Sequence, residues 1–459
     1  MDQGGAKLDD GGTTDAARDA GRRDASNAGD GRVAECVPGR SSCSNNQATY
    51  CRPDGTLARY ECDPVQGLTC AKDTCRGACD LGEIDSSYIG CDYYPTITLN
   101  PVWTGFPFAV AVANASGQPT HVTITRGDTV VQEADVSADS LQTFTLPWIT
   151  ELKGGELSGA TAETCTIPPA RGNTRLVADG AYRVRTTRPV TVYQFSPLQY
   201  QLENAPLCPT TTSQCAGSVV NECYSYSNDA SLLLPATALT GNYTALSWPS
   251  QEEGSGFIAV TAVEDGTQVK VIGAGAFMPG AGIEASGGTA TLNRGDVLEL
   301  VASSDASGTR VRADKPVQVI AGHSCAFVPN EDTLNCDHLE EVQFPEDTLG
   351  KKYVVPGVIF TDGTSGTPSV VRVAAVADGT NVSFTPALHA PATLQAGAFL
   401  ELSLAAGQSV VIDGDKPLQV AHYMVGQGLI PNSNTFGDPS QSAAVPVEQW
   451  RQSYLFTAP

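Results

Sequence analysis

The chain has 459 residues, with 50 acidic against 27 basic side chains and a net charge of −23. Nucleic-acid binding needs basic patches, so this charge excludes a nucleic-acid partner from our expectations and indicates a solvated surface. The longest apolar runs fall short of the roughly eighteen residues that a membrane span requires, so we expect no transmembrane segment. Abundant Gly and Pro, with many Val and Thr, favour an all-β chain rich in turns.

Residues 1–33 consist mainly of Asp, Gly, Ala, Ser, Thr and Arg. Such a segment buries too little apolar surface to offset its conformational entropy, so we expect a disordered acidic tether. It carries no apolar signal core, although the cysteines that follow indicate export. Either a signal or lipoprotein leader has been removed, which would allow a lipid anchor, or the start codon is misplaced.

The cysteine content indicates an oxidising compartment, because an even number of cysteines, fourteen, is clustered rather than scattered. Eight of them lie in a module over 34–92, and none has the Cys-x-x-Cys spacing of zinc or redox sites. We predict disulfide bonds throughout: within the module, in two further bridges near the link after the first β unit, and in one local bridge. The cysteines, in that order, are Cys36, Cys43, Cys51, Cys62, Cys70, Cys75, Cys79 and Cys91; Cys165, Cys208, Cys215 and Cys223; and Cys325 with Cys336.

A pattern of alternating apolar residues is written three times after the module. Its clearest copy, 256–272, has an Asp265-Gly266 turn between two alternating runs, which predicts a β-hairpin. The same plan recurs at 369–386 and, more loosely, at 106–124. Each copy is followed by a strand-like run, at 141–148, 295–301 and 397–404, and then by a longer pattern, at 180–195, 308–325 and 407–423.

This repetition predicts three β units of domain size, over 93–228, 229–340 and 341–459. The predicted fold is therefore all-β: tandem β-sandwich-like repeat units preceded by a small disulfide-rich module and a disordered tether. A rival arrangement interleaves the three repeats as blades of one larger β assembly. The last unit ends just after a strand-like run, which suggests a truncated C-terminal tail.

Catalytic motifs are absent from the sequence, so we expect no enzyme. The five histidines stand outside any zinc-binding, nucleophile-elbow or phosphate-loop pattern. A hydrolase with an unrecognised site remains a third hypothesis, and loss of a detected activity on alanine substitution of His323 or His338 would be needed to support it. We expect no cofactor.

Acidic residues crowd into 330–347, beside Cys325 and Cys336. Hard cations take several carboxylate oxygens, so calcium would suit this loop, with Asp332, Asp337 and Glu340 as weak candidate ligands. Their spacing matches no established calcium loop. Partner contact and a plain structural role are the two other interpretations.

The order of several motifs resembles a known family. Gly90-Cys91-Asp92-Tyr93-Tyr94, a strand at 108–112, Ala313-Asp314-Lys315-Pro316-Val317, Cys336-Asp337-His338-Leu339-Glu340, Gly437-Asp438-Pro439-Ser440 and Val445-Pro446-Val447-Glu448-Gln449 resemble the N-terminal domain of the IgG Fc-binding protein family over 90–459. The tether and module resemble leader regions of exported bacterial, especially myxobacterial, surface proteins. The resemblance implies a non-catalytic extracellular binding module, and no residue here matches an Fc contact.

We therefore expect a secreted or outer-surface binding and adhesion protein that recognises an extracellular protein or glycan, such as a glycoprotein or polysaccharide, through loops of a rigid β scaffold. The alternative from another class is a purely structural spacer or matrix component without a specific ligand.

Overall fold

The structure, a computed structural model, describes residues 36–37, 40–51, 57–71, 73–80, 87–154, 172–203, 222–225, 227–252, 254–274, 277–333, 336–359, 366–430 and 438–451. The tether expected over 1–33 and the end of the tail lie outside these residues. Nowhere in the described ranges is a helix long and apolar enough to cross a membrane. The regular structure is almost entirely strand, which confirms the expected all-β class.

The helical elements of the described ranges are single turns. They are α1 (Thr150–Lys153), η1 (Pro64–Gln66), η2 (Ala236–Ala238), η3 (Glu346–Thr348), η4 (Gln427–Leu429) and η5 (Val447–Gln449).

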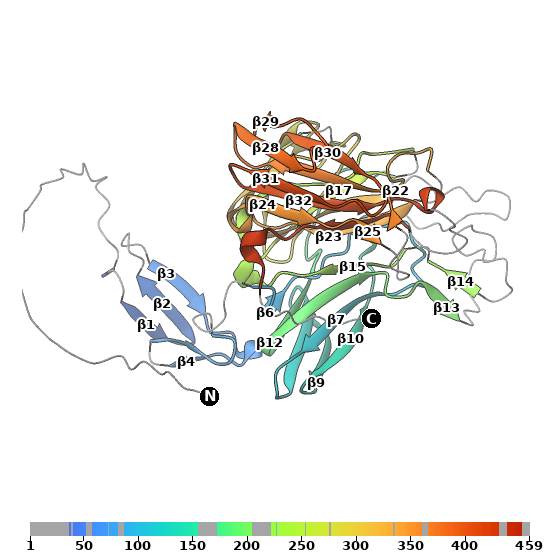
Figure 1. The fold of residues 1–459 in the computed structure, drawn as a ribbon. Helices are drawn as coiled ribbons and strands as arrows, with labels where there is room; N and C mark the ends of the chain where they lie inside the picture. The colour runs from blue at the N-terminus through green and yellow to red at the C-terminus, as the bar shows by residue number, and fades with distance from the viewer. Residues whose placement is uncertain are drawn as a thin grey trace, which may run out of the picture.

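The Cys-rich module stands at one side of the larger β array (Figure 1). One antiparallel sheet contains β1 (Ser41–Ser44), β2 (Gln47–Cys51) and β3 (Leu57–Glu61), and a second contains β4 (Thr69–Ala71) and β5 (Thr74–Arg76). Four disulfide bonds hold it, joining Cys36 to Cys51, Cys43 to Cys70, Cys62 to Cys75 and Cys79 to Cys91. These bonds stabilise a module whose apolar core is too small to do so alone.

Ion pairs fasten the module to the first large sheet. Arg185 Nη1 lies 3.0 Å from Asp63 Oδ2, and Arg183 Nη2 lies 3.8 Å from the same oxygen. All three side chains are at least three-quarters buried, so these contacts are shielded from solvent screening.

The first large sheet is built around one long strand, β12 (Tyr182–Ser196). The sheet order is β10-β7-β12-β8-β9, and two further strands also pair with β12. Its other strands are β6 (Gly90–Tyr93), β7 (Phe108–Asn114), β8 (Thr120–Arg126), β9 (Thr129–Val136), β10 (Ser140–Leu146) and β15 (Asp229–Leu232).

The second sheet repeats this plan around β22 (Thr309–Ala326), in the order β11-β21-β17-β22-β18-β20-β19, with two more strands on β22. Its other strands are β11 (Arg175–Val177), β16 (Thr240–Ala245), β17 (Gly256–Ala262), β18 (Thr267–Ile272), β19 (Ile283–Glu284), β20 (Gly287–Leu292), β21 (Val297–Val301) and β23 (Asp337–Val342).

In the third repeat the long strand is divided in two, and two four-stranded sheets result. Their orders are β24-β31-β28-β29 and β30-β27-β32-β33. The strands are β24 (Lys352–Val355), β27 (Ser369–Ala375), β28 (Thr380–Thr385), β29 (Ala392–Leu394), β30 (Phe399–Leu404), β31 (Val410–Gly414), β32 (Leu418–Met424) and β33 (Ser440–Ala443); two separate pairs are β13 (Gln201–Glu203) with β14 (Glu222–Tyr224) and β25 (Val358–Ile359) with β26 (Gly366–Thr367).

The predicted hairpin over 256–272 is wrong, although both of its strands exist. β17 pairs with β21 and β22, whereas β18 pairs with β20 and β22, so β22 lies between them. All seven residues of β17 are buried, which requires a central position with a neighbour on each side. Gly266 has the positive φ of 64° that the turn needs, but this turn leads into the other half of a curled sheet.

The same arrangement explains the repeated pattern at 308–325. The first part of β22 pairs with β18, and after the corner at Asp314-Lys315-Pro316 its second part pairs with β17. One strand thereby closes both halves of the unit into a curled, sandwich-like sheet. β12 does the same between β8 and β7.

The apolar core runs from one repeat to the next. Phe257 and Ala259 of β17 face the core of the first repeat, whereas Ile258 and Val260 face the core inside the second. A further cluster, which contains Trp248, joins the second repeat to the third. In Figure 1 the orange and red strands of the third repeat accordingly stack beside those of the second.

Two short strands pair across the expected unit boundaries. β11 comes from 93–228 but pairs with β21, and β15 comes from 229–340 but pairs with β12. The division into units over 93–228, 229–340 and 341–459 therefore stays a prediction that needs its own test.

One buried arginine fastens the second and third repeats together. Arg372 of β27 is 3 % exposed, donates to Ser247 O at 2.7 Å and lies 3.0 Å from Asp305 Oδ2. Its other guanidinium nitrogen lies 2.8 Å from Glu401 Oε2. The guanidinium stacks 4.2 Å from the centre of a Trp248 ring, a favourable cation–π geometry.

Candidate functional site

The acidic segment predicted around 330–347 divides into an exposed and a buried part. Asp332 is exposed on its loop, whereas Asp337 and Glu340 belong to β23 and are 8 % and 2 % exposed. The structure joins Cys325 to Cys336, the local pair expected from the sequence. β23 pairs with β22 and carries its polar side chains into the junction with the first repeat.

A chain of hydrogen bonds links β23 to distant segments. Glu340 Oε2 accepts from Thr98 Oγ1 at 3.0 Å, and Glu340 Oε1 accepts from Gln194 Nε2 at 2.9 Å. His338 Nε2 lies 3.3 Å from Thr98 Oγ1, and His338 Nδ1 lies 2.8 Å from Asp229 Oδ2. We call these five residues the buried junction.

Burial determines the protonation of the buried junction. Burial lowers the pKa of His338 to about 4, so the ring is neutral and carries one N–H. Three groups surround the ring: the Thr98 hydroxyl, the Leu99 backbone and the Asp229 carboxyl. Burial raises the pKa of Asp229 well above its ordinary value, so in the tautomer with its N–H on Nε2, Nδ1 can accept from a protonated Asp229.

Other acidic groups in and beside the buried junction also have raised pKa values. Burial raises the pKa of Glu340 to about 7 and that of Asp438, which precedes β33, also to about 7. The pKa of Asp337 is raised by burial and by the charges of Asp229 and Asp438. Much of the local negative charge is therefore neutralised by protons near neutral pH.

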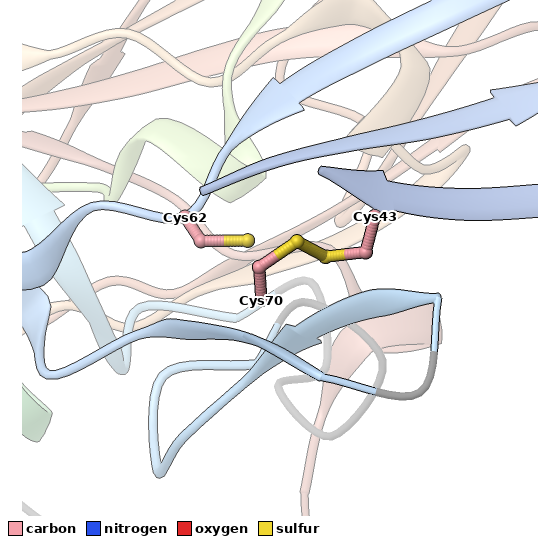
Figure 2. A group of neighbouring side chains, drawn as sticks. All are labelled: Cys43, Cys62 and Cys70. Atoms are coloured by element: carbon pink, nitrogen blue, oxygen red, sulfur yellow. A yellow bond between two sulfur atoms is a disulfide. The ribbon is translucent and has the colours of Figure 1, made fainter. Parts of the chain in front are cut away.

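The three candidate calcium ligands do not come together as a ligand set. Across the described residues, the only group of three potential ligand atoms close enough to share an ion is the sulfurs of Cys43, Cys62 and Cys70. Figure 2 shows the Cys62 sulfur beside the Cys43–Cys70 disulfide, and Cys62 is itself bonded to Cys75. These sulfurs are consumed by disulfide bonds, and a metal ligand needs a free thiolate.

The two other predicted disulfide bonds involve cysteines whose side chains lie outside the described residues. Cys165, Cys208 and Cys215 lie in ranges that the structure does not describe, and the side chain of Cys223 in β14 is likewise not described.

Sequence reasoning missed three members of the buried junction, Thr98, Gln194 and Asp229. They lie roughly 110 to 240 residues from β23 along the chain, so no spacing rule joins them. One local signal exists: Gln194 follows Val190 and Val192 on one face of β12, and it is fully buried. Buried polar side chains have partners, so such a residue marks a polar site.

The surface carries a separate open cleft of about 720 Å³ on the first repeat. It lies where β9 faces β10 across the open seam of the curled sheet, and Gln132 bridges the seam by donating to Thr145 O. Trp148 forms part of its wall and donates from Nε1 to Phe106 O at 2.8 Å. The lining residues, none of them charged, are Thr104, Pro107, Val131, Gln132, Thr145, Leu146, Pro147, Trp148 and Thr150.

Comparison with known proteins decides the family. The family model described as IgGFc binding protein matches residues 229–459, half of the chain. The chain belongs to the IgGFc-binding protein family. The match contains β23 with Asp337, His338 and Glu340, whereas the cleft lies before it.

A human member of the family shows direct similarity. The human protein called IgGFc-binding protein is 29% identical over 153 residues, which is 32% of this chain and 3% of the human protein. The chain therefore aligns with only a small part of that relative's length. The bacterial and myxobacterial character expected from the leader region stays a prediction.

Two solved structures from Bacteroides uniformis were also similar at a low level. A β-glucuronidase 2 and a β-glucuronidase each have a TM-score of 0.11 and 10% identity, covering 77% of this chain and 25% of theirs. Similarity this low carries no argument about fold or activity.

Proposed function

We propose that the chain is an extracellular binding protein that recognises a protein partner, namely a glycoprotein, through the loops of its rigid β scaffold. Family membership over 229–459 carries this proposal, because the family is one of binding proteins. The human relative's name says that it binds IgG Fc, which makes Fc the first partner to test. Loops on a stiff scaffold supply specificity without reorganisation on binding.

An extracellular location supports the same function. Disulfide bonds in the described residues, five in number, persist in oxidising compartments. A lipid anchor after leader removal, an adhesive role and glycan recognition extend the proposal further. The proposal includes no catalysis on outside substrates: in the described ranges the polar cluster around Glu340 is closed to them, with Thr98 and Glu340 at most 2 % exposed.

The cleft on the first repeat is our candidate contact surface. An aromatic wall with surrounding hydroxyl and amide groups and no charge suits neutral, amphipathic surfaces such as a glycoprotein offers. Trp148 supplies the aromatic group, and Thr104, Gln132 and Thr150 supply polar groups.

Biolayer interferometry of the oxidised chain on IgG Fc, mucin and polysaccharide surfaces tests the proposal. We expect saturable binding to Fc at about 10 μM or tighter, which corresponds to about −7 kcal/mol. Thr145→Arg, which places a long side chain in the cleft, should weaken binding at least tenfold if the cleft is the contact. Thr143→Arg is the matched control, because Thr143 is also exposed and lies two residues away on the same face of β10.

The binding results distinguish whether the chain binds a partner from where on the chain the partner is bound. Saturable binding that Thr145→Arg leaves unchanged would move the contact to the loops of 229–459. Absence of saturable binding to every surface would contradict the proposed function and favour the structural spacer.

A further inference from the structure

The carboxamide of Gln194 is held against an extended segment of the first repeat. Gln194 Oε1 accepts from the backbone N–H of Thr96 at 3.0 Å, and Gln194 Nε2 donates to Thr96 O at 3.0 Å. Both residues are fully buried. A fixed N–H directed at a carbonyl oxygen is the group that stabilises negative charge on that oxygen during acyl transfer.

The hydroxyl of Thr98 and the carboxamide of Gln194 contact the same carboxyl group, that of Glu340. Thr98 Oγ1 donates to one oxygen of Glu340, at 3.0 Å, and the amide nitrogen of Gln194 donates to the other, at 2.9 Å. Glu340 thereby contacts both an alcohol that can attack and an amide nitrogen that can leave. His338 Nε2 also lies 3.3 Å from this hydroxyl oxygen, and His338 Nδ1 lies 2.8 Å from Asp229 Oδ2.

The surroundings favour an acyl product once it is made. Thr98 and Gln194 are each 0 % exposed, and Glu340 and His338 are each 2 % exposed. Exclusion of water protects an ester from hydrolysis. Burial also places the pKa of Glu340 at about 7, which suits a carboxyl group that must accept and return a proton near neutral pH.

We propose that Thr98 and Gln194 form an intramolecular ester cross-link, with Glu340 as the proton carrier. The Thr98 Oγ1–Gln194 Cδ bond forms and the Cδ–Nε2 bond breaks. The hydroxyl proton passes to the Glu340 carboxylate, the backbone N–H of Thr96 holds the oxyanion, and Glu340 returns the proton to the departing nitrogen. One molecule of ammonia leaves, and no oxidant or other reactant is consumed.

The cross-link would tie the segment after β6 to β12, the central strand of the first sheet. It would make a covalent loop of residues 98 to 194, and the described residues of that range contain no disulfide bond. This inference is independent of the proposed function, because it concerns only the chain's own residues.

Intact-mass spectrometry of the full chain, reduced and denatured, tests the proposal. The wild-type chain should be lighter than its sequence requires by the mass of one ammonia molecule. Thr98→Val removes the attacking hydroxyl at nearly constant volume, and Glu340→Gln removes the proton carrier; both should abolish the deficit. Thr191→Val is the matched control. Thr191, in β12, is a buried threonine like Thr98, but its hydroxyl has no hydrogen-bond partner among the described residues. The mass deficit should persist in this variant.

Peptide mapping keeps the test decisive even if a variant fails to fold. Digestion of the wild-type chain should yield one peptide containing Thr98 joined to one containing Gln194, and hydroxylamine should separate them because it cleaves esters. A wild-type mass equal to that of the sequence would overturn the proposal. So would a deficit that persists in folded Thr98→Val, because it would arise from ammonia loss elsewhere, such as at an asparagine.

Discussion

Replacing Arg372 by methionine should lower the free energy of unfolding by about 3 to 5 kcal/mol, the combined loss of a charge-assisted hydrogen bond and a desolvated cation–π contact. The guanidinium is 3 % exposed and lies between two repeats, so its removal affects contacts on both sides. Methionine keeps most of the apolar stem, so the loss reports the charged head.

The contacts of Arg372 account for this magnitude. Its hydrogen bond to Ser247 O at 2.7 Å is charge-assisted and contributes about 1.5 to 3 kcal/mol. Stacking on Trp248 contributes about 2 kcal/mol when the pair is desolvated. The carboxylates of Asp305 and Glu401 are 27% and 41% exposed, so they regain water when the arginine is lost and limit the total. Arg372→Lys should lose about 2 kcal/mol, because an ammonium cannot form the planar fork.

Urea unfolding followed by tryptophan fluorescence is the suitable assay, because Trp248 contacts the substituted side chain. Lys270→Met is the control: Lys270 is exposed on β18 of the second repeat, and such a change should stay within about 0.5 kcal/mol of wild type. A loss below about 1 kcal/mol for Arg372→Met would refute the reasoning, since it would mean that the stacked, paired head contributes no more than a surface charge.

Three further predictions follow from other parts of the fold. Glu299 is fully buried, and burial raises its pKa from 4.5 to about 8, so its contribution to stability is complete below pH 4.5 and is lost as the pH rises to about 8. Glu299→Gln should remove up to about 5 kcal/mol of this pH dependence. Parallel curves of urea midpoint against pH for the wild type and the variant would contradict this prediction. Replacing both Cys325 and Cys336 by alanine opens a bridge of sequence separation 11 and should cost about 3 kcal/mol, with no change in urea midpoint as the contrary result. If 93–228, 229–340 and 341–459 are separate units, limited proteolysis should cut near 228 and 340. Because β11 and β15 pair across the first boundary, we expect the first two fragments to co-elute in gel filtration until denaturant is added. Separation of the two fragments in native buffer would refute that pairing.

The sequence predicted the strands better than their partners. Alternation located β17, β18, β21 and β22, because the side-chain period of two is a local property. The pairing partners of β17 depend instead on the burial of both faces of this strand, and one of those faces is buried by the core of the first repeat. A turn sequence cannot distinguish a hairpin from a connection between two sheet halves when a third strand enters between them.

The candidate site divides along the same line. Composition drew attention to Asp337 and Glu340, but a list of acids does not reveal that they point inward. The partner Thr98 comes from the extended segment after β6 and Gln194 from β12, and both meet β23 only through the curled first sheet. Gln194 was visible in principle as a polar residue on the same strand face as Val190 and Val192, whereas nothing near Thr98 sets it apart.

The Cys79–Cys91 bond has a mechanical consequence. Cys91 lies within β6, which runs antiparallel to β12 at the centre of the first sheet. A pulling force on the Cys-rich module therefore enters the sheet through a covalent bond to a paired strand. Sliding β6 along β12 would require several ladder hydrogen bonds to break together, so the module and the sheet should bear load as one body.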